Sequence, residues 1–187
     1  MIRISSALIL LLSILQSPAE TRKPAPGPAR IILLRHAEKP DDKEDPHLSP
    51  AGVKRAARLV AFIMTDPVMS SAGRPVAIFA TESTKHDRGQ RTQETVAPLA
   101  RALKLPVLTP FHGKQYRPLA KQILSTPAYA GKTVLICWNH EEIPALAEAL
   151  GVTPAPAKWK GSVFDEVYVI TYANGRATLN RYRYKGK

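Results

Sequence analysis

Three short apolar runs in this 187-residue chain each end in residues that carry charged or reactive side chains. The runs span residues 31–34, 76–80 and 133–138. The residues after them are Arg35 with His36, the loop 81–91 that ends in Arg91, and Asn139 with His140 and Glu141. In an open α/β sheet, ligands bind beyond the carboxyl ends of the strands. We therefore expect one pocket that contains two histidines, two arginines and a carboxylate.

These residues fit none of several other common catalytic motifs. The chain contains no G-x-S-x-G elbow of a serine hydrolase and no glycine-rich phosphate loop after a strand. Pro144 stands where a zinc-binding H-E-x-x-H motif needs its second histidine. Ile143 stands where a cysteine phosphatase built on Cys137 needs an arginine. With a single cysteine, the chain also cannot form a disulfide scaffold or a zinc finger.

Four segments, in chain order, resemble motifs of the histidine phosphatase (phosphoglycerate mutase-like) superfamily. They are Leu34-Arg35-His36-Ala37-Glu38, Leu48-Ser49-Pro50-Ala51-Gly52, Arg91-Thr92-Gln93-Glu94-Thr95, and Trp138-Asn139-His140 followed by Ile143-Pro144-Ala145-Leu146. The first resembles the R-H-G-type signature, the second the L-T/S-x-x-G helix start, and the last two the second arginine and the second histidine. Residues 159–169 also resemble the C-terminal strand region of small exported members.

The resemblance implies a metal-independent phosphatase that hydrolyses a phosphomonoester and needs no cofactor. His36 would be the nucleophile, because a neutral imidazole nitrogen attacks phosphorus and the phosphohistidine formed hydrolyses readily. Arg35, Arg91 and His140 would bind the phosphoryl oxygens, and the two arginines would supply the positive charge that Mg²⁺ supplies elsewhere. Lys39, beside the signature, is a further candidate contact for the substrate.

The proton donor and the second arginine are the least defined parts of this site. Many family members place a glutamate after the third helix region, but residues 104–130 contain no Asp or Glu. Glu141 resembles the acid of the phytase-like branch, Glu142 and Glu38 are alternatives, and some members manage without a donor. Arg88 competes with Arg91 for the role of pocket arginine, and the spacing of Arg91 to Thr95 favours Arg91.

The elements that must position these residues alternate between strands and helices. Helices are predicted from Ser49 to residue 64, and over 88–103, 116–124 and 143–150. Further strands are predicted at 106–108, 164–172 and 177–184, the last two joined at Asn174-Gly175 by a tight turn. The predicted class is α/β: a three-layer sandwich with a mainly parallel central sheet flanked by helices and a C-terminal antiparallel hairpin.

The first 29 residues are expected to lie outside the folded domain. Residues 1–19 read as a signal peptide, with a basic start, an apolar run and small residues before a cleavage site. Residues 20–29 read as a proline-rich linker, which leaves 30–187 as the histidine phosphatase-like domain. We therefore expect an exported protein, periplasmic or secreted, without stable membrane insertion after cleavage; the alternative is a retained N-terminal anchor.

The formal charge of +12 indicates an anionic partner, and the motifs narrow it to a phosphorylated substrate. A basic edge strand facing solvent explains residues 181–185 more simply than nucleic-acid binding does. Two other functions stay open: a non-catalytic protein that binds a phosphorylated or anionic ligand in the same pocket, and a phosphoglycerate mutase-type phosphotransferase. The short chain disfavours the mutase, which needs a long insert to exclude water. The natural substrate and the oligomeric state cannot be read from the sequence.

Overall fold

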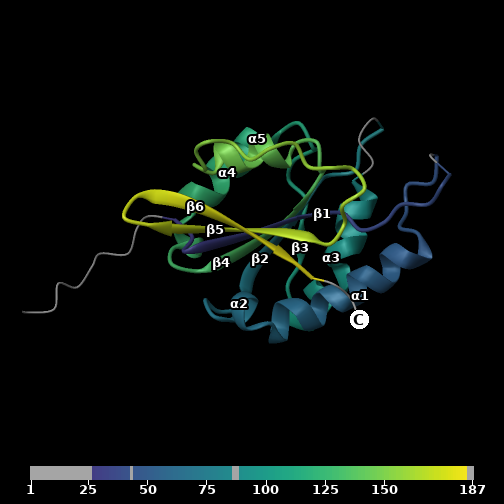
Figure 1. Ribbon diagram of the computed structural model, residues 1–187, viewed down its shortest axis with the longest axis horizontal. Coiled ribbons are helices and arrows are strands. Elements are labelled where there is room, and N and C mark those ends of the chain that lie inside the picture. Colours follow the sequence, from purple (N-terminus) through teal and green to yellow (C-terminus); the bar gives the residue numbers. More distant parts are fainter. Residues whose placement is uncertain (1–26, 43, 86–88, 185–187) are drawn as a thin grey trace, which may run out of the picture.

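One mixed sheet forms the centre of the computed structural model, which describes residues 27–42, 44–85 and 89–184 (Figure 1). Within these residues six strands lie in the order β3-β2-β4-β1-β5-β6. They are β1 (Arg30–Arg35), β2 (Pro75–Ala80), β3 (Val107–Leu108), β4 (Thr133–Trp138), β5 (Glu166–Ala173) and β6 (Arg176–Arg183). The first four pair in parallel, whereas β5 is antiparallel to β1 and β6 is antiparallel to β5.

Helices cover both faces of this sheet, so the fold has three layers (Figure 1). On one face lie α4 (Tyr116–Ser125) and α5 (Ile143–Ala149), and on the other lie α1 (Pro50–Thr65), α2 (Pro67–Ser70) and α3 (Gln90–Leu103). A short 3-10 helix, η1 (Pro127–Tyr129), precedes β4. The predicted α/β class, with a mainly parallel sheet and a C-terminal antiparallel hairpin, is confirmed.

The central strands β1 and β4 are buried along their whole length because each face meets a separate hydrophobic core. In β1, Ile31 and Leu33 belong to the core under α4 and α5, while Ile32 and Leu34 belong to the core under α1 and α3. This two-sided burial explains the continuous apolar run, since a strand exposed on one face would alternate with polar residues. Arg35 is the first residue after the run and is the last residue of β1, at the carboxyl end of this central strand.

Two predicted boundaries are confirmed by their local geometry. Ser49 caps α1, because its Oγ accepts a hydrogen bond from the Gly52 amide at 3.1 Å, and Pro50 is the first helical residue. Asn174 and Gly175 have φ angles of 54° and 73°, as expected of a tight turn between antiparallel strands. β6, which follows the turn, is one of the two edge strands of the sheet, and β3 is the other.

Some expectations differ from the structure or lie outside its described part. α3 begins at Gln90 rather than near residue 88, and α2 and η1 were not predicted. The predicted signal peptide and most of the predicted linker fall within residues 1–26, which lie outside the described residues. In the described part of the chain, no helix is both long enough and apolar enough to cross a membrane.

Candidate active site

A cavity of about 520 Å³ lies beyond the carboxyl ends of β1 and β4. Its lining consists of Arg35, His36, Lys39, Arg91, Asn139, His140, Glu141 and Gly161. All six site residues predicted from the sequence are in this group, together with Asn139 and Gly161. The structure therefore brings to one place side chains that lie more than 100 positions apart in the chain.

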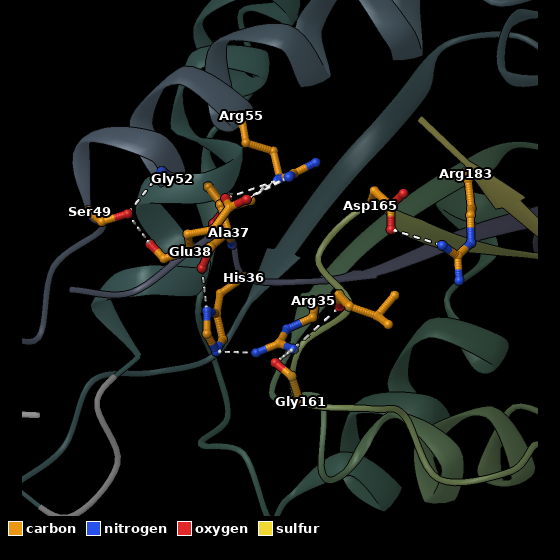
Figure 2. Close-up of polar contacts among 12 residues, drawn as sticks. Arg35, His36, Ala37, Glu38, Ser49, Gly52, Arg55, Gly161, Asp165 and Arg183 are labelled. Carbon is orange, nitrogen blue, oxygen red and sulfur yellow. Dashed lines mark hydrogen bonds and ion pairs between the residues drawn. The ribbon is translucent and has the colours of Figure 1, made fainter. Parts of the chain in front are cut away.

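His36 has a defined tautomer because the neighbouring backbone carbonyl accepts a hydrogen bond from one ring nitrogen, which therefore carries the proton. Nδ1 donates a hydrogen bond to the Ala37 carbonyl oxygen at 2.7 Å, which leaves Nε2 with its lone pair (Figure 2). An N–H of the Arg35 guanidinium points to this Nε2 at 3.4 Å. Burial, followed by the positive charge of Arg35, lowers the pKa of His36 to about 4. The imidazole is therefore neutral at physiological pH.

Arg35 is buried, with 3% of its surface exposed, and is held by the loop that precedes β5. Its Nη1 donates to the carbonyl oxygen of Gly161 at 2.7 Å and to that of Val163 at 3.4 Å. Its guanidinium carbon lies 4.0 Å from the centre of the Phe164 ring, a cation–π contact. Burial lowers the pKa of Arg35 to about 10, so the guanidinium keeps its charge at neutral pH.

Arg91 lies in the first turn of α3 and reaches the loop between β1 and α1. Its Nε donates to the His47 carbonyl oxygen at 3.2 Å, and its Nη2 donates to the Asp45 carbonyl oxygen. One turn further, the Thr95 hydroxyl donates to the Arg91 carbonyl at 2.6 Å and accepts from the Ala37 amide at 2.8 Å. α3 thus positions both its own arginine and the backbone beside the His36 ring.

His140 follows β4 and faces His36 across the cavity. The two imidazole centres are 6.2 Å apart and the rings are nearly perpendicular, at 80°. Partial burial lowers the pKa of His140, and the positive charge of Arg35 lowers it further. Both histidines therefore favour the neutral form, in which each ring has one N–H donor and one acceptor.

The three candidate proton donors occupy different places. Glu141 lines the cavity and is exposed. Glu142 lines only a neighbouring cavity. Glu38 lies outside both, because Arg55 of α1 binds its carboxylate, with Nη2 at 2.5 Å and Nε at 2.7 Å from Oε1 (Figure 2). Burial, the largest single cause, would raise the pKa of Glu38, but the hydrogen bonds from Arg55, a backbone hydrogen bond and the charges of Arg55 and Arg35 together lower it. Of the three candidates, Glu38 is the one that lines neither cavity.

The described residues add no further arginine and no metal site to this cavity. Arg88, the arginine that competes with Arg91, lies outside the described residues. His47, whose carbonyl accepts from Arg91, is exposed and its ring contacts Glu94. In the ranges 27–42, 44–85 and 89–184, no group of three or more His, Cys, Asp or Glu side chains is arranged to hold a metal ion.

Sequence reasoning missed the loop before β5 as part of this site. Gly161 lines the cavity and, with Val163, supplies the carbonyl oxygens that hold Arg35. The loop is in turn fixed by Trp159, whose indole N–H donates to the Val163 carbonyl at 2.8 Å. The only available signal was the family resemblance of residues 159–169, which assigns these residues no role.

The solved structures of three phosphatases are among those similar to this chain. A protein assigned as the phosphohistidine phosphatase SixA from Agrobacterium tumefaciens is 18% identical, with a TM-score of 0.53 over 83% of this chain and 98% of that chain. A protein assigned as an alpha-ribazole-5'-P phosphatase from Escherichia coli K-12 is 14% identical, with a TM-score of 0.60 over 84% of this chain and 97% of that chain. A mycobacterial glucosyl-3-phosphoglycerate phosphatase, solved with inorganic phosphate, is 15% identical, with a TM-score of 0.57 over 83% and 97%.

These neighbours are all members of the histidine phosphatase superfamily, and this chain has their fold. The sequence itself matches no protein-family model and no curated protein. The resemblance carried by the four motifs is therefore confirmed at the level of the fold. A shared fold does not by itself define a reaction, which depends on the residues of the site.

Proposed function

We propose that the protein is a metal-independent phosphatase that hydrolyses a phosphomonoester through a phosphohistidine on His36. The observation that carries the proposal is the buried His36 ring, kept neutral with Nε2 unprotonated, in a cavity that two arginines also line. A neutral imidazole nitrogen beside fixed positive charge suits attack on a phosphate dianion. The fold supports the proposal, since one structure that shares it was solved with inorganic phosphate.

The reaction would proceed in two steps. Nε2 of His36 attacks phosphorus, the bond from phosphorus to the leaving oxygen breaks, and the Glu141 carboxylic acid gives that oxygen its proton. Water then attacks the phosphohistidine, the N–P bond breaks, and the Glu141 carboxylate takes the proton from the water. Inorganic phosphate leaves and His36 returns to its starting tautomer.

The role of the arginines is to stabilise charge on the transferring phosphoryl group. The carbonyl contacts hold both guanidinium planes in place, but a guanidinium has five N–H donors, so those contacts do not exhaust them. His140 adds a donor from the opposite side of the cavity. Losing one such donor typically costs about 2.7–4 kcal/mol of transition-state stabilisation.

The test is turnover of p-nitrophenyl phosphate by the purified domain in the presence of EDTA. We expect hydrolysis by the wild-type protein and none above background by His36→Ala, with circular dichroism showing that the variant is folded. Rapid quenching into alkali, where phosphohistidine persists, followed by peptide mass spectrometry should place the phosphoryl group on His36. Equal hydrolysis by both proteins, or loss of wild-type activity in EDTA, would refute the proposal.

A second function is favoured by one observation: Glu141, the carboxylate that lines the cavity, is exposed, whereas an acid poised near neutral pH is usually buried. A protein without an effective donor would bind a phosphorylated or anionic ligand without turnover. Tight binding of inorganic phosphate by calorimetry, with no hydrolysis across a broad panel of phosphoesters, would support this function. Turnover that disappears in His36→Ala would exclude it.

We also infer that residues 1–19 direct export and are removed. The inference rests on the basic start, the apolar run and the small residues at the end of this segment. Expression of the full chain in a bacterium, followed by cell fractionation and intact-mass analysis, should yield a periplasmic or secreted form that begins at Glu20. An unprocessed form in the membrane fraction would instead indicate the retained anchor.

A further inference from the structure

A second cavity, of about 530 Å³, adjoins the candidate active site. It is lined by Thr84, His112, Gly113, Lys114, Asn139, Glu141 and Glu142. Asn139 and Glu141 line both cavities. A substrate whose phosphoryl group lies beside His36 can therefore extend past Glu141 into the second cavity.

The second cavity has fixed walls, because hydrogen bonds hold the loops that form it. The Trp138 indole N–H donates to the Gly113 carbonyl at 2.8 Å, which ties the loop before α4 to the end of β4. The Glu82 amide donates to the Phe111 carbonyl at 2.8 Å, and the Glu142 amide donates to the Asn139 carbonyl at 3.0 Å. A site with such walls needs little reorganisation to accept a ligand.

The two cavities differ in their balance of charge. The first contains the cations Arg35, Lys39 and Arg91, and its one acidic residue is Glu141, which carries its proton before the attack in the proposed mechanism. The second contains Glu142 in addition to Glu141, against the single ammonium group of Lys114. A dianionic phosphoryl group therefore suits the first cavity, whereas a second anionic group would meet the Glu142 carboxylate in the other.

We propose that the second cavity binds the leaving group and selects phosphomonoesters of hydroxylated compounds that are uncharged or carry an amine. Phosphomonoesters with a second anionic group, such as sugar-acid phosphates, are disfavoured. The Thr84 hydroxyl, the His112 ring and the Asn139 amide provide hydrogen-bonding groups for hydroxyls. Of the two acidic residues, Glu142 is the one that determines specificity, since it lines only the second cavity whereas Glu141 lines both. The inference rests on the proposed phosphatase function.

Three phosphorylated six-carbon sugar derivatives of similar size provide the test, because each carries its phosphate on C6. They are glucosamine 6-phosphate with an amine, glucose 6-phosphate without a further charge, and 6-phosphogluconate with a carboxylate. We expect kcat/KM to fall in that order, with about a tenfold difference between the first and the last, which is the factor given by 1.4 kcal/mol. Glu142→Gln should reduce that ratio severalfold. Glu148→Gln is the matched control, since Glu148 is an exposed residue of α5 that lines neither cavity, and it should leave the ratio unchanged.

Binding measurements separate failure of this inference from failure of the proposed function. His36→Ala keeps the second cavity, so calorimetry with the same three compounds should give dissociation constants that rise from glucosamine 6-phosphate to 6-phosphogluconate, whether or not the wild type turns them over. Equal values for the three compounds, tighter binding of 6-phosphogluconate, or an unchanged ratio in Glu142→Gln would overturn the inference. Active wild-type enzyme with equal kcat/KM values would overturn it alone and leave the phosphatase function standing.

Discussion

The Nδ1 atom of His36 donates a hydrogen bond to the carbonyl oxygen of Ala37, the next residue in the chain, at 2.7 Å. This contact determines which ring nitrogen carries the proton, and so leaves Nε2 as the basic atom. The Ala37 amide is itself held by Thr95 of α3 at 2.8 Å. The chemistry available to His36 therefore depends on how a helix holds the backbone of the following residue.

The first prediction concerns the order in which two histidines titrate. Burial and the charge of Arg35 lower the pKa of His36 to about 4, whereas a hydrogen bond to Glu94 raises the pKa of the exposed His47. As the pH falls from 8, His47 should therefore gain its proton first and His36 last. Imidazole ¹⁵N chemical shifts, assigned with His36→Gln and His47→Gln, measure both. Titration of His36 near pH 6.5 would contradict the burial argument.

The second prediction is a loss of stability at acid pH that His36 causes. Between pH 6.5 and about 4 the unfolded chain protonates this histidine and the folded chain does not, so the unfolded state binds more protons. The destabilising contribution of His36 is absent above pH 6.5, where both states leave this histidine neutral. Below pH 6.5 the free energy of unfolding falls as the pH drops towards 4. Between pH 7 and pH 5 the free energy of unfolding should fall by about 2 kcal/mol more in the wild type than in His36→Gln. Urea denaturation at both values measures this, and identical slopes for the two proteins would refute it.

The third prediction tests how α3 holds the backbone next to His36. Thr95→Val removes the acceptor of the Ala37 amide and leaves a buried N–H without a partner. The free energy of unfolding should fall by about 1–3 kcal/mol, and kcat for p-nitrophenyl phosphate should fall by about tenfold or more because the nucleophile shifts. Thr95→Ser keeps the hydroxyl and should restore most of both. If the Thr95→Val and Thr95→Ser variants have the same kcat and the same free energy of unfolding, the Thr95 hydroxyl has no positioning role.

The fold was largely predictable from the sequence because burial leaves a pattern. Strands covered on both faces are continuous apolar runs, as in residues 31–34, and helices show apolar residues at helical spacing. The positions of the site residues could be inferred from topology, since parallel strands bring the residues after their carboxyl ends to one edge of the sheet. Arg35 with His36 and Asn139 with His140 could therefore be expected together before any geometry was known.

Two aspects of the site could not be predicted, and both depend on contacts that leave no pattern in the side chains. The carbonyl of Gly161 holds Arg35, but a backbone oxygen carries no sequence signal. Glu38 lies two residues after His36 and so is an alternative acid by sequence, yet Arg55 binds it outside the cavity. That pairing depends on which residues of α1 face the chain after β1, which spacing alone does not define.

The fourth prediction separates the roles of Glu141 and Glu38, two of the candidate proton donors. Glu141→Gln removes the proposed proton donor, so alkyl phosphates should lose about 10²–10⁴-fold in kcat, whereas p-nitrophenyl phosphate, with its acidic leaving group, should lose little. Glu38→Gln should instead lower the free energy of unfolding by about 1.5–3 kcal/mol through its lost bonds to Arg55. A plot of log kcat against the pKa of the leaving group distinguishes the two variants. Its slope should become steeper only in Glu141→Gln.

The last prediction concerns Gly52, which lies where α1 passes closest to the chain after β1. A Cβ atom at this position would lie 2.3 Å from the Glu38 carbonyl oxygen, the same oxygen that accepts the Ser49 amide at 2.9 Å. Glycine to alanine within a helix normally stabilises by about 1 kcal/mol, but here the clash is with backbone. Gly52→Ala should therefore destabilise the protein by about 1–3 kcal/mol. It should also lower kcat, because Glu38 directly follows the Ala37 carbonyl that orients His36.

Ala57→Gly provides the control for Gly52→Ala, since Ala57 is an exposed position of the same helix. It should cost about 1 kcal/mol through helix propensity alone and leave kcat unchanged. Thermal or urea unfolding together with p-nitrophenyl phosphate turnover measures both variants. If Gly52→Ala were as stable and as active as the wild type, the close approach of α1 to Glu38 would not restrain the signature, and the alignment of His36 would have to come from Thr95 alone.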